Sequence, residues 1–465
     1  MMSLNNVCDA VNGRLHGSDV VLENISINTR EDCDGRLFVA LKGDNFDAHD
    51  YLNQAAAAGA KAVMVERQAD VELPQIVVDD SHQALKDLAA WWRSKFSIPV
   101  MAVTGSVGKT TVKEMLRSIF AELGKGVVTH GNLNNEIGVP LTLMRLTKDD
   151  QYAVIEMGMN QAGEIGRLSA IGKPDVALVN NAGAAHLEGL GTVEAVAKAK
   201  GEIFSGLSEN GIAVINADDQ YAGIWIDLAE GKRVLSFSLN QTADVTGSYT
   251  ASANGLQIQA KIEGKPLSIS LNSLGEHSVR NALAAIAVAH AANVPFRSIK
   301  AGLEAYQPVR GRLNLIKLPS ATLFDDTYNA NPASMSAAIQ VLSSFQNTLL
   351  IVGDMAELGD SAEAEHLNLG ALASQCGVNG LLACGKYSEQ VISEFSGFKM
   401  AFDKQEDLIT HLSNSDLAVD AILVKGSRSA KMENVVEVIQ KLVAEGDAAK
   451  FDSSNDRLIN RGESN

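Results

Sequence analysis

The feature that most constrains this chain is an apolar stretch at residues 98–103 that runs directly into the sequence TGSVGKTT at residues 104–111. A helical pattern follows at residues 112–122. A strand, a glycine turn and a helix in this order are typical of a phosphate-binding loop, because the glycines let backbone N–H groups face the phosphates. Lys109 can reach the β- and γ-phosphates, and Thr110 can offer its hydroxyl to Mg²⁺. A plain glycine turn with a solvated lysine would not need all three parts in register. The predicted nucleotide-binding residues of this loop are Gly105, Ser106, Gly108, Lys109, Thr110 and Thr111.

The pattern around the loop predicts how the chain is organised. Its 465 residues suggest three domains at about 150 residues each. After the loop, strands alternate with helical segments, which predicts βαβ units and a mostly parallel sheet; these strands lie at 152–157, 176–180 and 212–216. A first region mixes short strands with helical stretches, and a third region has four further strands, at 321–324, 348–352, 380–383 and 421–424. We therefore predict an α/β fold of three domains, at residues 1–98, 99–312 and 313–450, with a disordered tail at 451–465.

Composition excludes several classes of protein. The net charge of −17 disfavours a general role in coating nucleic acid. No apolar run approaches the ~20 residues of a membrane span, and the first residues lack the basic start and apolar core of a secretory signal. The four cysteines form no CxxC motif, so we expect reduced thiols in a cytoplasmic protein.

Two polar side chains follow strands of the predicted central sheet. Glu156 ends the strand at 152–157, and His186 lies in the loop after the strand at 176–180. Ligands of open parallel sheets sit beyond the carboxyl ends of the strands, so a carboxylate there suits a hard cation that bridges phosphates. From the residues alone, Glu156 can also be a strand-end charge and His186 an ordinary loop histidine.

The loop and the motifs described next resemble those of the Mur ligases, the ATP-dependent amide-forming enzymes of peptidoglycan synthesis. The loop itself has the form TGxxGKT, since Val103 stands where the general GxxxxGK[ST] pattern has its first glycine. The resemblance covers nearly the whole chain. It implies an N-terminal α/β domain that binds the UDP-sugar, a central ATP-binding domain, and a C-terminal Rossmann-like α/β domain that closes on the incoming amino acid or dipeptide. It also implies ATP and Mg²⁺ as cofactors. We expect the chain to be a monomer.

The resemblance gives roles to side chains near the phosphate loop. Lys200 stands three positions before the pair Ile203-Phe204, where the family has a carbamylated lysine; spacing alone would leave Lys200 on a solvated helix face. Lys198 does not fit that register. The implied metal ligands are Thr110, Glu156, His186 and Lys200. The implied catalytic residues are Lys109, Lys200, His186 and Arg312.

Two further central motifs match the family. The run of amides and glycines at 129–138 resembles the loop that contacts the muramoyl-peptide substrate, which implies contacts from Asn132, Asn134 and Asn135. Residues 275–281 resemble the motif GxHNxxN, which would place His277 and Asn281 near the adenine, although Ser278 stands where an asparagine is usual. A turn, a helix cap or a packing role is the alternative for these residues.

The N-terminal motifs at 26–30 and 38–50 resemble those that cradle uridine and its diphosphate, and they argue against the folylpolyglutamate synthetase branch. The implied contacts are Ser26, Asn28, Thr29, Arg30, Lys42, Gly43, Asp47 and His49. Without the resemblance, a polar turn near a strand explains them equally well.

In the third domain, the resemblance places Arg312 at the γ-phosphate and Asp326 at the ribose or adenine side. Asn329 and Asn331 would line the cleft for nucleotide and acceptor. Other implied substrate contacts are Tyr328, Lys425, Ser427 and Arg428. The segments 353–359 and 425–433 are typical of the branch that adds a dipeptide, and no DNPR-type amino-acid motif is present.

The resemblance therefore implies a ligase that joins D-alanyl-D-alanine to UDP-N-acetylmuramoyl-tripeptide through an acyl phosphate. Two alternatives stay open: a ligase of the branch that adds a single diamino acid, and a regulatory nucleotide-binding module without ligase chemistry.

Overall fold

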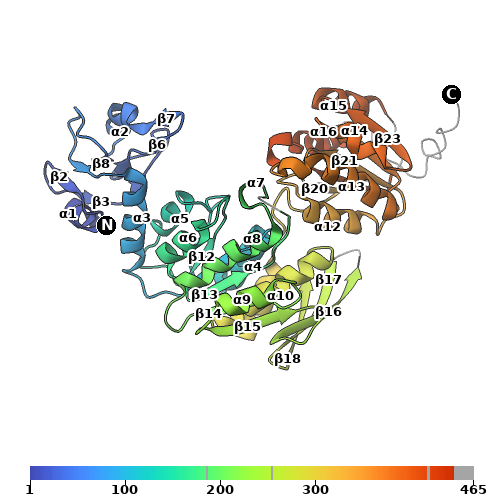
Figure 1. Ribbon diagram of the computed structural model, residues 1–465, viewed down its shortest axis with the longest axis horizontal. Coiled ribbons are helices and arrows are strands. Elements are labelled where there is room, and N and C mark those ends of the chain that lie inside the picture. The colour runs from blue at the N-terminus through green and yellow to red at the C-terminus, as the bar shows by residue number, and fades with distance from the viewer. Residues whose placement is uncertain (185–186, 253–254, 416–418, 445–465) are drawn as a thin grey trace.

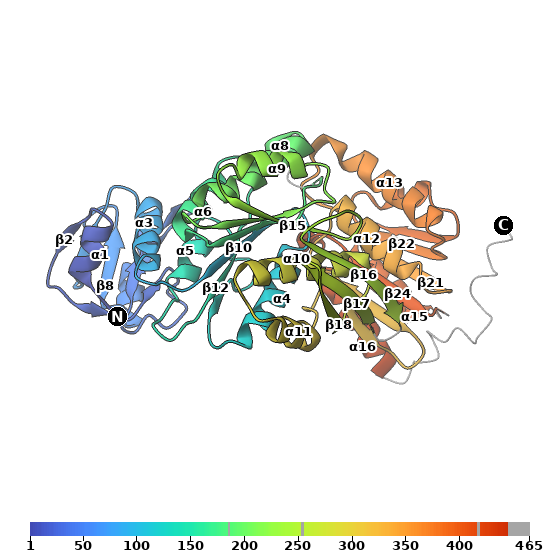
Figure 2. The same cartoon turned by 90° about the horizontal axis from the view of Figure 1, so that it is seen from below.

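The computed structural model describes residues 1–184, 187–252, 255–415 and 419–444, and its three large sheets follow one another along the chain (Figure 1). The predicted tail at 451–465 lies outside the described residues. Both views place the N-terminal sheet at one end, the central sheet in the middle and the C-terminal sheet at the other end (Figure 2).

The N-terminal sheet has five strands. In spatial order they are β2 (Arg14–His16), β9 (Gln75–Val77), β8 (Ala62–Val65), β5 (Leu37–Val39) and β4 (Ile25–Ser26). Only the pairing of β2 with β9 is antiparallel. Two small ribbons, β1 (Met2–Ser3) with β3 (Val21–Leu22) and β6 (Lys42–Gly43) with β7 (Phe46–Asp47), flank it. The helices here are α1 (Leu4–Ala10), a 3₁₀ turn (Ala48–Tyr51), α2 (Leu52–Ala57) and α3 (Ser81–Arg93).

The central sheet has nine strands, in the order β11 (Val127–Val128), β12 (Ala153–Glu156), β10 (Val100–Thr104), β13 (Val176–Val179), β14 (Ile212–Asn216), β15 (Arg233–Ser238), β16 (Val245–Ser252), β17 (Gly255–Ile262) and β18 (Lys265–Leu271). All pairings from β11 to β16 are parallel, and the last two are antiparallel. Its helices are α4 (Lys109–Ala121), α5 (Gly138–Leu143), α6 (Glu164–Gly172), α7 (Leu187–Leu190), α8 (Val193–Gly201), a 3₁₀ helix (Glu202–Gly206), α9 (Ala222–Leu228), α10 (Glu276–Ala291) and α11 (Phe296–Ala305).

Alternate side chains of the central strands enter two different hydrophobic cores. In β10, Met101 and Val103 pack with α4, α10 and α11, while Val100 and Ala102 pack on the opposite face. That second core continues without a break into α3 and the N-terminal sheet. Because successive strand residues point to opposite faces, helices on both faces bury the strand completely, which explains its continuous apolar run.

The C-terminal sheet has six strands, in the order β19 (Asn314–Lys317), β20 (Thr322–Asp326), β24 (Ala421–Lys425), β21 (Thr348–Gly353), β22 (Gly380–Cys384) and β23 (Phe398–Phe402). Only β19 runs antiparallel to its neighbour. Its helices are α12 (Pro332–Leu342), a 3₁₀ turn (Gly359–Ser361), α13 (Ala362–Gln375), α14 (Ser388–Ser393), α15 (Gln405–Asn414), a 3₁₀ turn (Arg428–Ala430) and α16 (Glu433–Ala444).

The α/β class and the mostly parallel central sheet are therefore confirmed. The largest element that the sequence pattern missed is the antiparallel extension β16–β18. The predicted helix at 112–122 begins earlier, at Lys109, because Gly108 with its φ of 81° caps α4. Among the described residues, no helix is long and apolar enough to cross a membrane.

Candidate active site

A cavity of about 980 Å³ lies between the central and C-terminal sheets, and most of the predicted site residues line it. The central domain contributes Ser106, Gly108, Lys109, Thr110, Thr111, Asn132, Asn134, Asn135, Glu156, His277 and Asn281. The C-terminal region contributes Arg312, Asp326, Tyr328, Asn329, Asn331, Lys425 and Arg428. Gly105, Lys200 and Ser427 do not line the cavity. His186 lies outside the described residues.

The phosphate loop has the geometry that its sequence predicts. A Cβ atom on Gly108 would lie 2.4 Å from Oδ1 of Asn281 and 2.6 Å from Nδ2 of Asn180, so this position needs glycine for space as well as for its positive φ. Nζ of Lys109 donates to the carbonyl of Gly105 at 2.6 Å. The surrounding protein lowers the pKa of Lys109 by excluding water, while the Glu156 carboxylate opposes this shift.

The loop is fastened to the end of β13 by two asparagines. The backbone N–H of Val107 donates to Oδ1 of Asn181 at 2.9 Å, and Nδ2 of Asn180 donates to the carbonyl of Val107 at 3.1 Å. The same Nδ2 also donates to Oδ1 of Asn281 on α10 at 3.0 Å. The N–H of Ser106 also donates to the carbonyl of Asn181. These bonds fix the turn beside α10, which carries the motif at residues 275–281.

Glu156 is buried at the carboxyl end of β12 with both oxygens engaged. Oε2 accepts a 2.8 Å bond from the Thr110 hydroxyl, and Oε1 accepts a 2.8 Å bond from Nδ2 of Asn134. Its own N–H donates to Oγ1 of Thr129. Thus the predicted metal carboxylate, the phosphate-loop threonine and a predicted substrate asparagine meet at one point.

This donor set fits Mg²⁺, although no group of three or more His, Cys, Asp or Glu side chains that could hold a metal occurs among the described residues. Magnesium is usually held through one or two carboxylates together with substrate phosphates, rather than by a cage made entirely of protein ligands. Glu156 and Thr110 supply one carboxylate and one hydroxyl next to the phosphate loop, which is the arrangement such a site needs.

Lys200 is fully buried, and its Nζ has no hydrogen-bond partner in the part of the chain that the structure describes. Burial lowers its pKa well below the usual value, and the positive charge of Lys109 acts in the same direction. Lys198, two residues earlier, is instead exposed and pairs with Glu194 at 2.7 Å. The alternative that Lys200 lies on a solvated helix face is therefore wrong.

The C-terminal side of the cavity carries a buried ion pair and a stacked arginine. Nζ of Lys425 lies 2.6 Å from Oδ2 of Asp326, and it also donates to the carbonyl of Asn329 at 2.8 Å. The Arg312 guanidinium lies over the Tyr328 ring, with Cζ 4.0 Å from the ring centroid. Arg312 lines the same cavity as the phosphate loop, and its positive charge contributes to the lowered pKa of Lys109.

Other predicted residues of this region have local structural partners. The Asn331 side chain caps α12 in a reciprocal pair with Ser334. The Ser427 hydroxyl is buried and bonds to the Ser429 hydroxyl. Arg428 pairs with Glu433 at 2.9 Å. Of these predicted residues, Arg428 and Asn331 line the cavity and Ser427 does not.

The motif predicted to lie near the adenine is at the start of α10. Removal from water lowers the pKa of His277, while the Asp326 carboxylate opposes the shift. Ser278, which departs from the family pattern, is buried and donates to the carbonyl of Leu274 at 2.8 Å. The hydroxyl of Ser278 therefore stabilises the start of α10.

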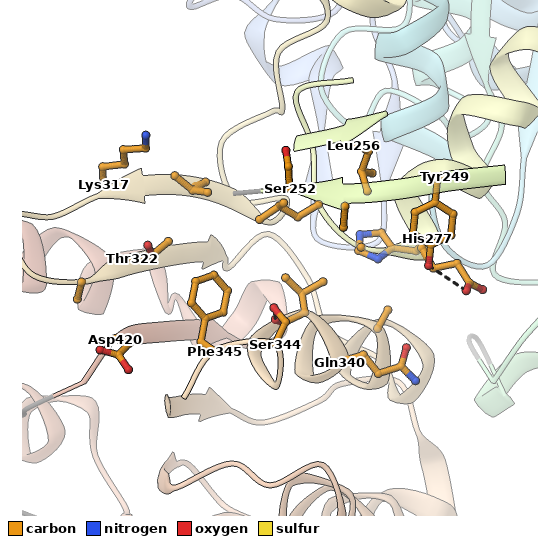
Figure 3. A pocket seen from close by; sticks show the side chains of 18 of the residues that line it. Tyr249, Ser252, Leu256, His277, Lys317, Thr322, Gln340, Ser344, Phe345 and Asp420 are labelled. Atoms are coloured by element: carbon orange, nitrogen blue, oxygen red, sulfur yellow. Dashed lines mark hydrogen bonds between the residues drawn. The ribbon is translucent and has the colours of Figure 1, made fainter. Parts of the chain in front are cut away.

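His277 also borders a second cavity, of about 1120 Å³, that separates β16 and β17 from β19, β20 and α12 (Figure 3). Phe345 and Gln340 come from the C-terminal side of this cavity, and Tyr249 and Leu256 come from the central side. The Tyr249 hydroxyl donates to Glu276 at 3.3 Å. Of the predicted site residues, only His277 is among those that line this second cavity.

The residues predicted to bind the uridine diphosphate lie in the N-terminal domain and do not line either cavity. Nδ1 of His49 contacts Oδ1 of Asp47 at 2.6 Å, and its Nε2 accepts from the N–H of Glu66 at 2.9 Å. The backbone N–H of His49, followed by its ring, lowers the pKa of Asp47 to about 2. Both ring nitrogens of His49 are therefore used within the protein.

The remaining N-terminal residues divide into a turn and an exposed ribbon. Oδ1 of Asn28 accepts from the N–H of Arg30 at 3.0 Å, and the Ser26 hydroxyl accepts from the N–H of Asn28. Lys42 and Gly43 form the exposed strand β6. The contacts observed inside the motif are those of a polar turn, and Thr29 belongs to the same segment.

Sequence reasoning missed Asn180, Asn181 and Lys113. The two asparagines directly follow β13, so the strand-end rule that singled out Glu156 would have found them. Lys113 stands four positions after Lys109 on α4, and the structure buries it beside Glu156 with Nζ 3.7 Å from Oε2.

Comparison with known proteins agrees with this geometry. Three family profiles match in order: "Mur ligase family, catalytic domain" at residues 21–93, "Mur ligase middle domain" at 103–289, and "Mur ligase, glutamate ligase domain" at 311–428. The UDP-N-acetylmuramoyl-tripeptide–D-alanyl-D-alanine ligase of Escherichia coli (strain K12) is 45% identical over 446 residues, which cover 95% of this chain and 98% of that protein.

Solved structures give the same result. A crystal structure of MurF from Acinetobacter baumannii superposes with a TM-score of 0.88 at 35% identity, covering 95% of this chain and 98% of that one. MurF from Thermotoga maritima in complex with ADP gives 0.81 at 28% identity, covering 92% and 100%. The resemblance that the motifs indicated is thereby confirmed, and the chain belongs to the Mur ligase family.

Proposed function

We propose that this chain is an ATP-dependent ligase that joins D-alanyl-D-alanine to UDP-N-acetylmuramoyl-tripeptide and releases ADP and phosphate. The observation that carries the proposal is the single cavity in which Lys109, Thr110 and Glu156 face Arg312 and Asp326. The relatives named for this reaction support the choice of branch. ATP use is common to the family, and the Thermotoga maritima relative was solved with ADP.

In this proposal, residues 1–98 hold the UDP-sugar, residues 99–312 hold ATP, and residues 313–450 hold the dipeptide and part of ATP. The polar contacts inside residues 26–49 shape that first site, and the exposed side chains of Arg30 and Lys42 supply positive charge for the diphosphate. ATP use and four free cysteines support a cytoplasmic location.

The proposed reaction has two steps, a phosphoryl transfer and an acyl transfer. A carboxylate oxygen at the C-terminus of the tripeptide attacks the γ-phosphorus of ATP, which forms an acyl phosphate and releases ADP. The amine of D-alanyl-D-alanine then attacks the acyl carbon, loses a proton, and the resulting tetrahedral intermediate expels phosphate. Two positively charged side chains that line the cavity, Lys109 and Arg312, stabilise the charge on the transferring group.

We further propose that Thr110 and Glu156 hold Mg²⁺, with His186 and a carbamylated Lys200 completing the metal sites. Bound Mg²⁺ would neutralise phosphate charge. A carbamate forms when a neutral amine adds to CO₂ and releases a proton. Burial of Lys200 without a hydrogen-bond partner among the described residues supports this, because its lowered pKa favours the neutral amine. A carbamate would also add negatively charged oxygens that can bind cations.

An assay with different amine substrates tests whether the chain adds a dipeptide or a single diamino acid. The purified chain, UDP-MurNAc-tripeptide and ATP are incubated with D-alanyl-D-alanine, and UDP-MurNAc-dipeptide is incubated in parallel with meso-diaminopimelate or L-lysine. Mass spectrometry of the products should show the pentapeptide only. A tripeptide product formed from the dipeptide substrate, with no pentapeptide, would overturn the proposed branch. Comparing UDP-MurNAc-tripeptides that end in meso-diaminopimelate or L-lysine then identifies the preferred third residue.

A further inference from the structure

Lys113 is a buried lysine that the chemistry above does not use. Its side chain is 1% exposed, and it lies on α4 one helical turn after Lys109. Burial of an ammonium costs several kcal/mol unless its donors are satisfied. A methionine could fill the same volume without that cost, so the contacts of the charged end need an explanation.

The ammonium of Lys113 meets acceptors from three elements. Nζ donates to the carbonyl of Thr129 at 2.9 Å and to the carbonyl of Gly131 at 3.5 Å. It lies 3.2 Å from Oε1 of Glu114 on its own helix and 3.7 Å from Oε2 of Glu156 on β12. The two carbonyls belong to the segment that follows β11 and leads directly into Asn132.

These contacts close a ring. Starting from Lys113, the ring passes through the backbone of Thr129 and Gly131 to Asn134, whose side chain donates to Glu156. Glu156 returns to α4 through the hydroxyl of Thr110. A second link runs inside the ring, since the Glu156 N–H donates to the Thr129 hydroxyl at 2.9 Å.

Within this ring of contacts, Lys113 bonds to the turn at residues 129–131, which precedes Asn132. A Cβ built on Gly131 would meet nothing within 4 Å, and this glycine has a φ of 55°. The Cβ side of Gly131 is therefore open, while its carbonyl accepts the bond from Lys113.

We propose that Lys113 is a positioning residue for the substrate: it holds the segment 129–135 so that Asn132, Asn134 and Asn135 can contact the UDP-muramoyl-peptide. It acts through the loop and touches neither ATP nor the reacting atoms. The inference rests on the proposed function, since these asparagines are assigned to that substrate there.

The test compares Lys113→Met with the wild type and with Arg117→Met. Arg117 lies on the same helix, is exposed and pairs with Glu114, so its variant removes the same charge without touching the loop. Calorimetry measures the dissociation constants of UDP-MurNAc-tripeptide and of a non-hydrolysable ATP analogue. Steady-state kinetics measure KM and kcat, and hydrogen exchange follows the amides of residues 129–138.

Lys113→Met should weaken binding of UDP-MurNAc-tripeptide by about tenfold or more, by analogy with the losses seen when residues that support metal ligands are changed. It should also raise the KM to match and speed exchange in residues 129–138. Affinity for the ATP analogue should stay within about twofold, a selectivity that general destabilisation would not give. Arg117→Met should match the wild type. If Lys113→Met does not fold, Lys113→Gln, which keeps a donor but loses the charge and the reach, replaces it with the same expected pattern.

Equal loss of affinity for substrate and ATP analogue, or wild-type substrate binding and exchange in the variant, would overturn the role of Lys113. A wild-type chain that does not bind UDP-MurNAc-tripeptide would overturn the proposed function itself, so the two failures are distinguishable.

Discussion

The hydroxyl of Thr110 donates a 2.8 Å hydrogen bond to Oε2 of Glu156, which joins the first turn of α4 to the carboxyl end of β12. The two residues are 46 positions apart in the chain. They meet because β10 and β12 are parallel neighbours, and both strands therefore end at the same edge of the sheet. We propose that the cation and the phosphates bind at this pair.

Glu156→Gln keeps the shape of the side chain, but it removes the charge and replaces one of the two acceptor oxygens, which bond to Thr110 and Asn134, with an NH₂ donor. We expect kcat/KM to fall at least 100-fold in a variant that still folds, because a neutral amide binds a hard cation weakly. A magnesium titration of phosphate release checks this. Wild-type activity at low magnesium in the variant would show that Glu156 is not a metal ligand.

Lys109→Ala should abolish turnover while the fold stays intact. A phosphate-loop lysine contributes several kcal/mol to phosphoryl transfer, which corresponds to a rate loss of about a thousandfold or more. The matched control is Lys261→Ala, an exposed lysine on β17 of the same domain, which should keep full activity. Circular dichroism confirms folding of both variants. Near-normal product formation by folded Lys109→Ala would refute the phosphate-loop assignment.

Lys200→Ala should lose most activity, and a small added carboxylate such as acetate should restore part of it by replacing the carbamate. Lys198→Ala, which removes an exposed lysine of the same helix, should be nearly silent. Initial rates with and without acetate check both variants. If Lys198→Ala is the inactive variant, the register is wrong, and if both are active, no carbamate is needed at either lysine.

Lys425→Met should weaken the C-terminal sheet, because it leaves the Asp326 carboxylate without its ion-pair partner. Breaking a buried pair costs roughly 3–5 kcal/mol. Hydrogen exchange of the β20 and β24 amides measures this loss of stability locally. Tryptophan fluorescence would not report it, since all three tryptophans lie in the other two domains. The double variant Lys425→Met/Asp326→Asn should lose less than the single one. A double variant that is less stable than Lys425→Met would argue against the pair as the cause.

The domains should close further on substrates, because the proposed ATP contacts are divided between Lys109 in the central domain and Asp326 in the third. Solution scattering with an ATP analogue and UDP-MurNAc-tripeptide should give a smaller radius of gyration than the free chain. An unchanged radius would count against closure.

Local sequence patterns predicted the parts of the site that are local in the chain. The turn at Gly108 and the placement of Lys109 and Thr110 follow from one strand–turn–helix unit, and burial of Glu156 follows from its place at a strand end. The ion pair between Asp326 and Lys425 could not be derived in this way, because the two residues are 99 positions apart and meet only through the pairing of β20 with β24. The family resemblance named both residues, but it did not pair them.

Lys113 shows a different limit. Its position on an amphipathic helix is equally compatible with a solvated lysine, and its burial depends on the segment 129–131 folding over α4. The antiparallel strands β16–β18 were missed for a related reason. Their alternating pattern is visible in β17, where Leu256, Ile258 and Ala260 are buried, but alternation does not reveal that the ribbon extends a parallel sheet.

The central claim, that this chain is an acceptor-dependent ligase, is tested most directly by phosphate release in the presence of ATP and Mg²⁺. We predict release that requires both UDP-MurNAc-tripeptide and D-alanyl-D-alanine, with one phosphate for each pentapeptide formed. Phosphate release at the same rate without the UDP-muramoyl substrate, and without any pentapeptide, would contradict it and would instead indicate a nucleotide-hydrolysing regulatory module.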